Sequence, residues 1–289
     1  MENQQPLDIE ALKEEAITAL MEDCEPFLEP GVANKRLEGL RNAKVLGPAQ
    51  LVEEVERATG LKLPEDKVGG IIVFDGDDKL GRRALLGEVD SPLVAYHTAV
   101  HEGIHLLGPD SRRGADVFER EYISKSLGPR WTTLYLNEEG EVVETQPIRH
   151  EEKLFWEAVT DFVAAKKTSE KFGSEETDRE LIAEGKGFLQ RYWIEFLVKA
   201  HPNPDELLKT LKQALYQGSE IEFLRVLGGR LDNPHVPLYY TLAAYMKEGD
   251  DAIEEGRSED YNTALEKWMT AIRNHFTNGG AYSLNMEHF

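Results

Sequence analysis

Two histidines spaced by four positions, His101 and His105, are the residues of this chain best suited to chemistry, and they stand in the segment HEGIH. In an α-helix, residues four apart lie on one face a turn apart, so both imidazoles can be directed at one point. That arrangement suits two neighbouring ligands of a tetrahedral zinc ion. Glu102 faces a neighbouring direction, where its carboxylate could take a proton from a water held by the metal. The segment therefore predicts a zinc site with two histidine ligands and Glu102 as general base.

The HEGIH pattern is unlikely to arise by chance, and it falls on a predicted helix. With 8 histidines and 54 acidic residues among 289, at most about 0.04 matches are expected at random. Ser91 and Pro92 are typical of a helix start. Gly108 and Pro109 are typical of a helix end, so we expect the helix to end at Leu107. The plain alternative is that both histidines are core or solvated residues of an amphipathic helix.

A catalytic zinc site needs a third protein ligand. Glu157 lies in a predicted helix over residues 150–166, and Asp161 follows one turn later on the same face. Asp161 could accept the second ring N–H of a ligating histidine, for which His101 is the first choice. The neighbours of these acids are mostly apolar or small, which favours burial and therefore partners for both carboxylates. We predict Glu157 as third ligand and Asp161 as the residue that orients His101; the alternative is that both are surface acids.

Other residues compete for these roles. Asp110 could follow HExxH as a local ligand after a glycine turn, but that pattern requires the ligand at position 111, which is Ser111. Glu151 and Glu152 are further alternatives to Glu157. His97 lies one turn before the first histidine of the motif and too far along a straight helix to share its ion. We interpret His97 as a packed residue or a residue behind the ligands.

HEGIH at 101–105 together with EAVTD at 157–161 resembles the gluzincins, the zinc metallopeptidases related to thermolysin, which carry HExxH on one helix and ExxxD on a later one. The resemblance covers residues 82–166. It implies that His101, His105 and Glu157 bind zinc, that Glu102 is the general base, and that Asp161 orients a ligating histidine.

The same resemblance implies two features of substrate binding. A strand over residues 82–88 would offer its edge to an extended peptide. A tyrosine or histidine would stabilise the oxyanion, and His150, Tyr239 and Tyr240 are the candidates, although each is more simply explained as a structural residue.

The elements that must position these residues predict an α+β fold. We expect a zincin-like core, in which a small mixed sheet packs on the active-site helix, followed by a mostly helical C-terminal lobe. The predicted divisions are an N-terminal helical segment over 1–47, the catalytic core over 48–173 and the helical lobe over 174–289. The predicted helices cover 8–23, 49–59, 91–107, 150–166, 178–200, 205–217, 219–226, 237–246 and 261–276, and the predicted strands cover 68–74, 82–88, 131–137 and 141–146.

Composition excludes several classes of partner. Lys and Arg number 33 against 54 Asp and Glu, a net charge of −21, which disfavours nucleic acid and anionic membrane surfaces. No stretch is apolar enough for a signal peptide or a membrane span, so a cytoplasmic location is expected. Cys24 is the single cysteine, which excludes an intrachain disulfide and a thiolate-rich metal site.

The predicted function is a zinc-dependent metallopeptidase with one Zn²⁺ per chain and a peptide or protein as substrate. Two alternatives stay open at this point. One is a zinc amidohydrolase that cleaves a different amide. The other is a catalytically inactive, metal-stabilised interaction module. The sequence carries no signal for an oligomeric state.

Overall fold

The computed structural model describes residues 8–59, 70–74, 82–109, 111–115, 121–127, 130–136, 142–147, 150–183, 190–227 and 238–278. Two compact units make up the chain, Met1–Pro109 with Thr160–Phe188 and Asp110–Val159 with Leu189–Phe289. Helix α5 (His150–Phe172) continues across the division between them. The predicted three-part division at residues 47 and 173 concerns folding units and stays a prediction.

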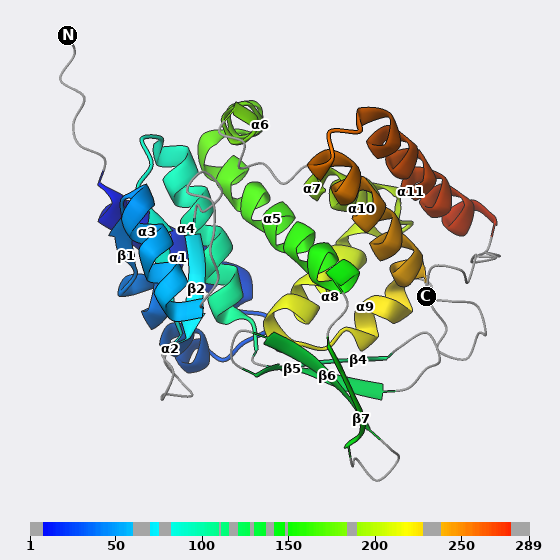
Figure 1. The fold of residues 1–289 in the computed structure, drawn as a ribbon, viewed down its shortest axis with the longest axis horizontal. Coiled ribbons are helices and arrows are strands. Elements are labelled where there is room, and N and C mark those ends of the chain that lie inside the picture. The colour runs from blue at the N-terminus through cyan, green and yellow to red at the C-terminus, as the bar shows by residue number, and fades with distance from the viewer. Residues whose placement is uncertain are drawn as a thin grey trace. The chain divides into compact units, whose positions relative to one another are not determined.

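The first unit combines helices with a small mixed sheet (Figure 1). In the sheet order β1-β3-β2, β3 pairs in parallel with β1 and antiparallel with β2. Its elements are α1 (Ile9–Cys24), α2 (Pro30–Arg41), β1 (Lys44–Leu46), α3 (Pro48–Thr59), β2 (Gly70–Phe74), β3 (Arg82–Gly87), α4 (Pro92–Leu107), the part of α5 after Val159, and α6 (Ser174–Ala183).

Both faces of β3 are covered. Leu85 packs with Leu51 and Val55 of α3 in one apolar cluster. Successive side chains of a strand point to opposite faces, so Ala84 and Leu86 point the other way, and both are buried. Helices α2 and α4 also contact β3. Strand β3 is therefore a buried support for α4, the helix that carries the HEGIH segment.

Helices α1 and α2 pack closely against α4. The contact is closest at Gly103, where an added Cβ would lie 2.3 Å from Leu20 Cδ1 and 3.1 Å from Leu40 Cδ2. Both leucines are fully buried. Since ordinary carbon contacts are about 3.5–4 Å, only glycine fits at this position of α4.

The second unit holds an antiparallel sheet and most of the later helices. The sheet order β4-β5-β6-β7 follows the chain order. Its elements are β4 (Ser111–Ala115), β5 (Glu121–Leu127), β6 (Arg130–Leu136), β7 (Val142–Pro147), the part of α5 up to Val159, α7 (Arg191–Ala200), α8 (Pro204–Gln217), α9 (Ile221–Val226), α10 (Leu238–Glu254) and α11 (Ser258–Asn278).

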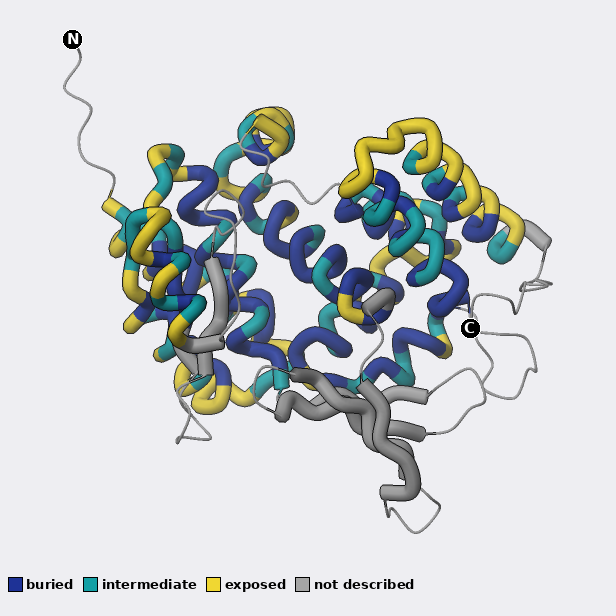
Figure 2. Tube along the Cα trace, in the orientation of Figure 1, coloured by how far each residue is buried: buried dark blue, intermediate teal, exposed yellow. Residues whose placement is uncertain are grey.

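An aromatic cluster forms the core of the second unit. The Phe155 ring centroid lies 5.0 Å from that of Tyr239 and 5.8 Å from that of Phe223, and Trp268 lies 6.4 Å away. All four side chains are fully buried. In Figure 2 the exposed residues of this unit concentrate on α11, whereas the described residues of α5 are mostly buried.

The predicted α+β class agrees with a structure in which helices predominate and small sheets accompany them. The predicted hairpin is confirmed as β6 paired with β7. After Ser174 the described elements are helices, as expected, although the predicted helix over 178–200 ends at Ala183 and a new one begins at Arg191. Among helices of the described residues, none has the length and apolar composition required to cross a bilayer.

One expectation drawn from the family resemblance is wrong. The strand over 82–88 was expected to offer a free edge to substrate, but β3 is the central strand of its sheet, with β1 on one side and β2 on the other. On one side β2 pairs with residues 82–86, and on the other side β1 pairs with residues 85–87. Strand β3 therefore does not offer a free edge along its length.

Candidate metal centre

Both ends of α4 are fixed by local interactions that the sequence encodes. The Ser91 hydroxyl accepts a hydrogen bond from the Val94 N–H at 3.3 Å, and Pro92 occupies the first turn. At the other end, the Gly108 N–H donates to the Ile104 carbonyl at 3.0 Å. These ends match the predicted helix and hold the HEGIH segment in regular α-helix.

An arginine from α2 adds a tertiary cap to the end of α4. The Arg36 guanidinium donates to the Leu107 carbonyl, one of the carbonyls that a helix end leaves without an intrahelical donor. Burial lowers the pKa of Arg36, but an arginine keeps its charge in proteins. A cation at a helix C-terminus also favours the helix dipole. The interaction holds α2 to the turn that follows His105.

Helix α5 packs along α4 in the opposite direction. The rings of Tyr96 and Phe172 meet edge to face with centroids 5.7 Å apart. Nearer the start of α4, Leu93 and Val94 form an apolar cluster with Ala165 of α5 and with Leu181 of α6. From Tyr96 onward the partners on α5 fall in number, from Phe172 through Thr168 beside His97 to Asp161 beside His101. The stripe of α5 that begins with Asp161 therefore faces the histidine stripe of α4.

His101 and His105 turn their imidazoles toward each other. Their Nε2 atoms lie 3.1 Å apart, and their ring centroids lie 4.9 Å apart. Two Zn–N bonds of about 2.0–2.1 Å at a tetrahedral angle place their nitrogens about 3.3–3.4 Å apart. The observed separation is close to that value, so the pair fits two ligands of one zinc ion.

Glu157 supplies the third donor of this group. One ligand atom from each of His101, His105 and Glu157 lies within 4.8 Å of the other two. Glu157 is one helical turn before Asp161 on α5. The structure therefore brings together the three side chains that the sequence predicts as ligands, with two imidazole nitrogens and one carboxylate oxygen.

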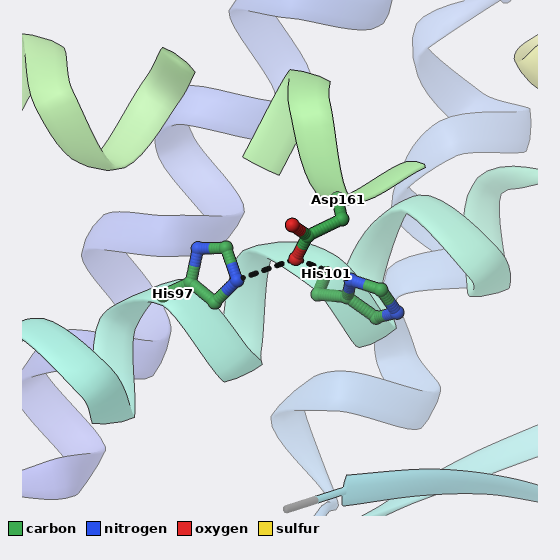
Figure 3. A group of neighbouring side chains, drawn as sticks. All are labelled: His97, His101 and Asp161. Carbon is green, nitrogen blue, oxygen red and sulfur yellow. Dashed lines mark hydrogen bonds and ion pairs between the residues drawn. The ribbon is translucent and has the colours of Figure 1, made fainter. Parts of the chain in front are cut away.

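Asp161 lies between two histidines of α4, as Figure 3 shows. Its Oδ1 is 3.0 Å from His97 Nε2 and 3.7 Å from His101 Nδ1. Burial alone would raise the pKa of the Asp161 carboxyl, but hydrogen bonds from His101 and His97 and their charge outweigh it and hold that pKa below its ordinary value. The carboxylate therefore faces Nδ1 of His101, the histidine that it was predicted to orient, and lies closer to His97.

Two residue groups around His101 could hold a metal ion, and they differ in exposure. One group consists of His101, His105 and Glu157, which are all partly exposed. The other consists of His97, His101 and Asp161, in which His97 is 4% exposed and Asp161 is 3% exposed. A catalytic zinc site keeps one coordination position open to water or substrate. Exposure therefore favours the group with Glu157, with Asp161 and His97 behind it.

The remaining candidates have different positions. Glu102 is buried beside the histidines on α4, at 6% exposure. Glu152 is also buried, on the first turn of α5, and belongs to neither metal group. Asp110, and the side chains of Glu151 and His150, lie outside the described residues. Tyr239 and Tyr240 are buried in the second unit, with Tyr239 in the aromatic cluster, which agrees with the structural role suggested for them.

Thr168 was not among the site residues predicted from the sequence. This residue is fully buried, and its Oγ1 lies 3.3 Å from His97 Nδ1. A signal for it exists in the spacing, because residue 168 is seven positions after residue 161 and so lies on the same helix face. The spacing of His97 from His101 gives the matching signal on α4.

Comparison of this chain with protein-family models, with curated proteins and with solved structures gives no match. The case for a function consists of the sequence motif and the geometry around His101.

Proposed function

We propose that this protein is a zinc-dependent metallopeptidase of the gluzincin type, with α4 and α5 as the active-site helices of a zincin-like core. The observation that supports the proposal most strongly is the convergence of His101, His105 and Glu157, whose ligand atoms lie within 4.8 Å of one another. Two neutral imidazoles and one carboxylate form a ligand set found in catalytic zinc sites that cleave peptides.

A bound zinc ion would supply a lowered pKa for a coordinated water and polarisation of the scissile carbonyl. Glu102 follows the first ligand in the chain and is the proposed general base. Its carboxylate takes a proton from the attacking water as the C–O bond forms, and then gives that proton to the leaving nitrogen as the C–N bond breaks. The products are one peptide with a new carboxylate and one with a new amine.

Asp161 prepares His101 for this role. A carboxylate accepts hydrogen bonds and does not donate them, so the Asp161 carboxylate, 3.7 Å from Nδ1, favours the tautomer of His101 that carries its proton on that atom. The Nε2 lone pair of His101 is then available on the side where His105 Nε2 lies. This is the tautomer that a metal ligand at Nε2 requires.

The peptide substrate is part of the proposal and comes from the resemblance of the two motifs to gluzincins. Because β3 is paired on both sides, strand addition at that position has no part in the proposal. An amide other than a peptide bond stays the alternative substrate.

The test combines elemental analysis with cleavage of a peptide library by the full-length chain. We expect about one zinc per chain. Glu102→Gln should keep the zinc and lose hydrolysis by at least about 100-fold, whereas His101→Ala should lose both. Glu38→Gln makes the same chemical change at an exposed position of α2 and should leave zinc and hydrolysis unchanged.

Each other outcome has a defined meaning. Glu102→Gln with wild-type turnover would exclude Glu102 as the base. A wild-type protein that holds one zinc but cleaves no peptide would favour the amidohydrolase or the interaction module. A wild-type protein that binds no zinc at neutral pH would overturn the site.

A further inference from the structure

A buried row of polar side chains continues behind His101, away from the proposed ligands. It consists of Asp161, His97 and Thr168, which are 3%, 4% and 0% exposed. Asp161 Oδ1 lies 3.0 Å from His97 Nε2, and His97 Nδ1 lies 3.3 Å from Thr168 Oγ1. The Thr168 hydroxyl donates to the Ala164 carbonyl at 2.8 Å. The row therefore ends on the backbone of α5.

Asp161 fixes a proton on His97, because a carboxylate can accept a hydrogen bond but cannot donate one. On one side of the ring, His97 Nδ1 lies 3.3 Å from the Thr168 hydroxyl, which also contacts the Ala164 carbonyl. The Asp161 carboxylate accepts from the Nε2–H on the other side of the same ring. His97 thus donates from Nε2 to Asp161, and its Nδ1 faces the Thr168 hydroxyl. A ring held at both ends cannot rotate without breaking a buried hydrogen bond.

His97 and His101 face the same oxygen atom of Asp161. Asp161 Oδ1 is the atom within 3.0 Å of His97 Nε2 and also the atom within 3.7 Å of His101 Nδ1. Hydrogen-bond partners behind a metal ligand commonly affect metal affinity about 10–100-fold. Buried side chains that fix the position of such a partner are therefore expected to affect metal affinity as well.

We propose that His97 and Thr168 are positioning residues of the metal centre, which fix the Asp161 carboxylate and through it the orientation and tautomer of His101. The inference rests on the proposed zinc site and extends it by two residues that the HExxH and ExxxD motifs do not include. His97 contacts no proposed substrate or metal atom, and it acts through Asp161.

Two substitutions of His97 separate a positioning role from a packing role. The amide nitrogen of Gln stands where Nε2 of histidine stands, so His97→Gln keeps a donor toward Asp161. The amide nitrogen of Asn stands where Nδ1 stands, so His97→Asn keeps a group near Thr168 and loses the donor to Asp161. Both variants are polar, and both are smaller than histidine.

The contribution of Thr168 can be tested with a matched control, Thr177. Thr168→Val removes the hydroxyl with little change in shape. Thr177→Val is the control, because Thr177 is also fully buried and also donates to a carbonyl four residues earlier, Gly173, at 2.8 Å. It lies on α6, outside the row behind His101.

The measurement is the zinc dissociation constant of the full-length chain, from competition with a chelator. His97→Asn should weaken zinc binding by about 10-fold or more, and His97→Gln should stay within about 3-fold of wild type. Thr168→Val should weaken binding by less than His97→Asn, and Thr177→Val should not change it. The visible spectrum of the cobalt-substituted protein should change in His97→Asn and be restored in His97→Gln.

Three results would overturn the inference. The first is equal affinity of His97→Asn and His97→Gln, whether both match wild type or both lose binding to the same degree. The second is a Thr168→Val effect no larger than that of Thr177→Val. The third is a protein that keeps one zinc in His105→Ala but loses it in both His97 variants, because the ion would then lie on the His97 side.

Failure of the zinc site itself would be seen separately. If wild-type protein binds no zinc, the proposed function fails. The ¹⁵N resonances of the imidazoles in the metal-free protein then still test the row: His101 should carry its proton on Nδ1 in wild type and His97→Gln, and should lose that preference in His97→Asn. An unchanged His101 tautomer in His97→Asn would refute the inference.

Discussion

Gly103 lies between the two histidines of the motif, and replacing it with alanine tests how the site is supported. An added Cβ would lie 2.3 Å from Leu20 Cδ1 and 3.1 Å from Leu40 Cδ2. Leu20 is on α1 and Leu40 is on α2, and both are fully buried. The two helices therefore have to move away from α4, or the leucines have to leave their preferred rotamers.

The expected change in unfolding free energy is the balance of two effects. Alanine is favoured over glycine inside a helix by about 1 kcal/mol. Overpacking of a filled core costs about 1–3 kcal/mol, and the short distance to Leu20 places this site in the upper part of that range. Gly103→Ala should therefore be destabilised by about 1–2 kcal/mol net, which lowers the melting temperature by about 2–8 °C.

A double-mutant cycle with Leu20→Ala isolates the contact. Leu20→Ala alone should cost about 2–5 kcal/mol through the cavity it leaves. In the double variant the new methyl group of residue 103 enters that cavity, so the two changes should be less than additive by about 1–3 kcal/mol.

The assay is urea unfolding followed by circular dichroism, and the control is a second helical glycine. Gly31 is in the first turn of α2, and an added Cβ there would meet nothing within 4 Å. Gly31→Ala should leave stability unchanged or raise it by up to about 1 kcal/mol. If Gly103→Ala is as stable as Gly31→Ala, or if the cycle is additive, the close packing of α1 on α4 is wrong.

Three further outcomes are expected. Ser91→Ala should lower the unfolding free energy by about 1 kcal/mol through loss of the cap on α4, with zinc stoichiometry unchanged, and a neutral result in thermal unfolding would count against the cap. Zinc at about 100 times its dissociation constant should stabilise the wild type by about 2.7 kcal/mol in melts with and without chelator, and an equal gain in His105→Ala would place the ion elsewhere. Burial raises the pKa of Cys24 from 9.0 to about 11. The folded state then keeps a proton that the unfolded chain loses, so stability should fall between pH 9 and pH 11. Cys24→Ser should lack this dependence, and an identical pH profile in both proteins would contradict the assignment.

The sequence predicted α4 well because its signals are local. The capping residues Ser91 and Gly108 directly flank the helix, and the hydrogen bond expected at each of them is present in the structure. The spacing of His101 and His105 needed only helical geometry to bring their Nε2 atoms together. These local interactions are present in the folded protein because the tertiary contacts of α4 are compatible with them.

Elements that depend on distant partners were missed. No helix was predicted between residues 23 and 49, but proline is tolerated in the first turn of a helix, and α2 begins at Pro30. Strand β1 has three residues, and its partner β3 lies about forty residues later in the chain. Because β1 was not predicted, β3 was wrongly expected to have a free edge.

The residues behind His101 show the same limit of prediction from sequence. Asp161 was predicted from its spacing to Glu157, which is a property of one helix. The contact between His97 and Thr168 joins two helices and depends on how α4 and α5 pack, for which the apolar cluster around Ala165 is responsible. The seven-residue spacing places Thr168 on the same face of α5 as Asp161, but that spacing does not say which residue of another helix the threonine meets.

The position of Gly103 also shows which side of α4 the first two helices cover. Residues 101 and 103 are about 200° apart around a helix, so α1 and α2 cover the side of α4 turned away from the imidazoles. A proteolytic cut after Arg41 would thus expose apolar core and leave access to the histidines as it was. If the proposed metal centre is correct, a segment that blocks it would have to lie on the side of α4 opposite to α1 and α2.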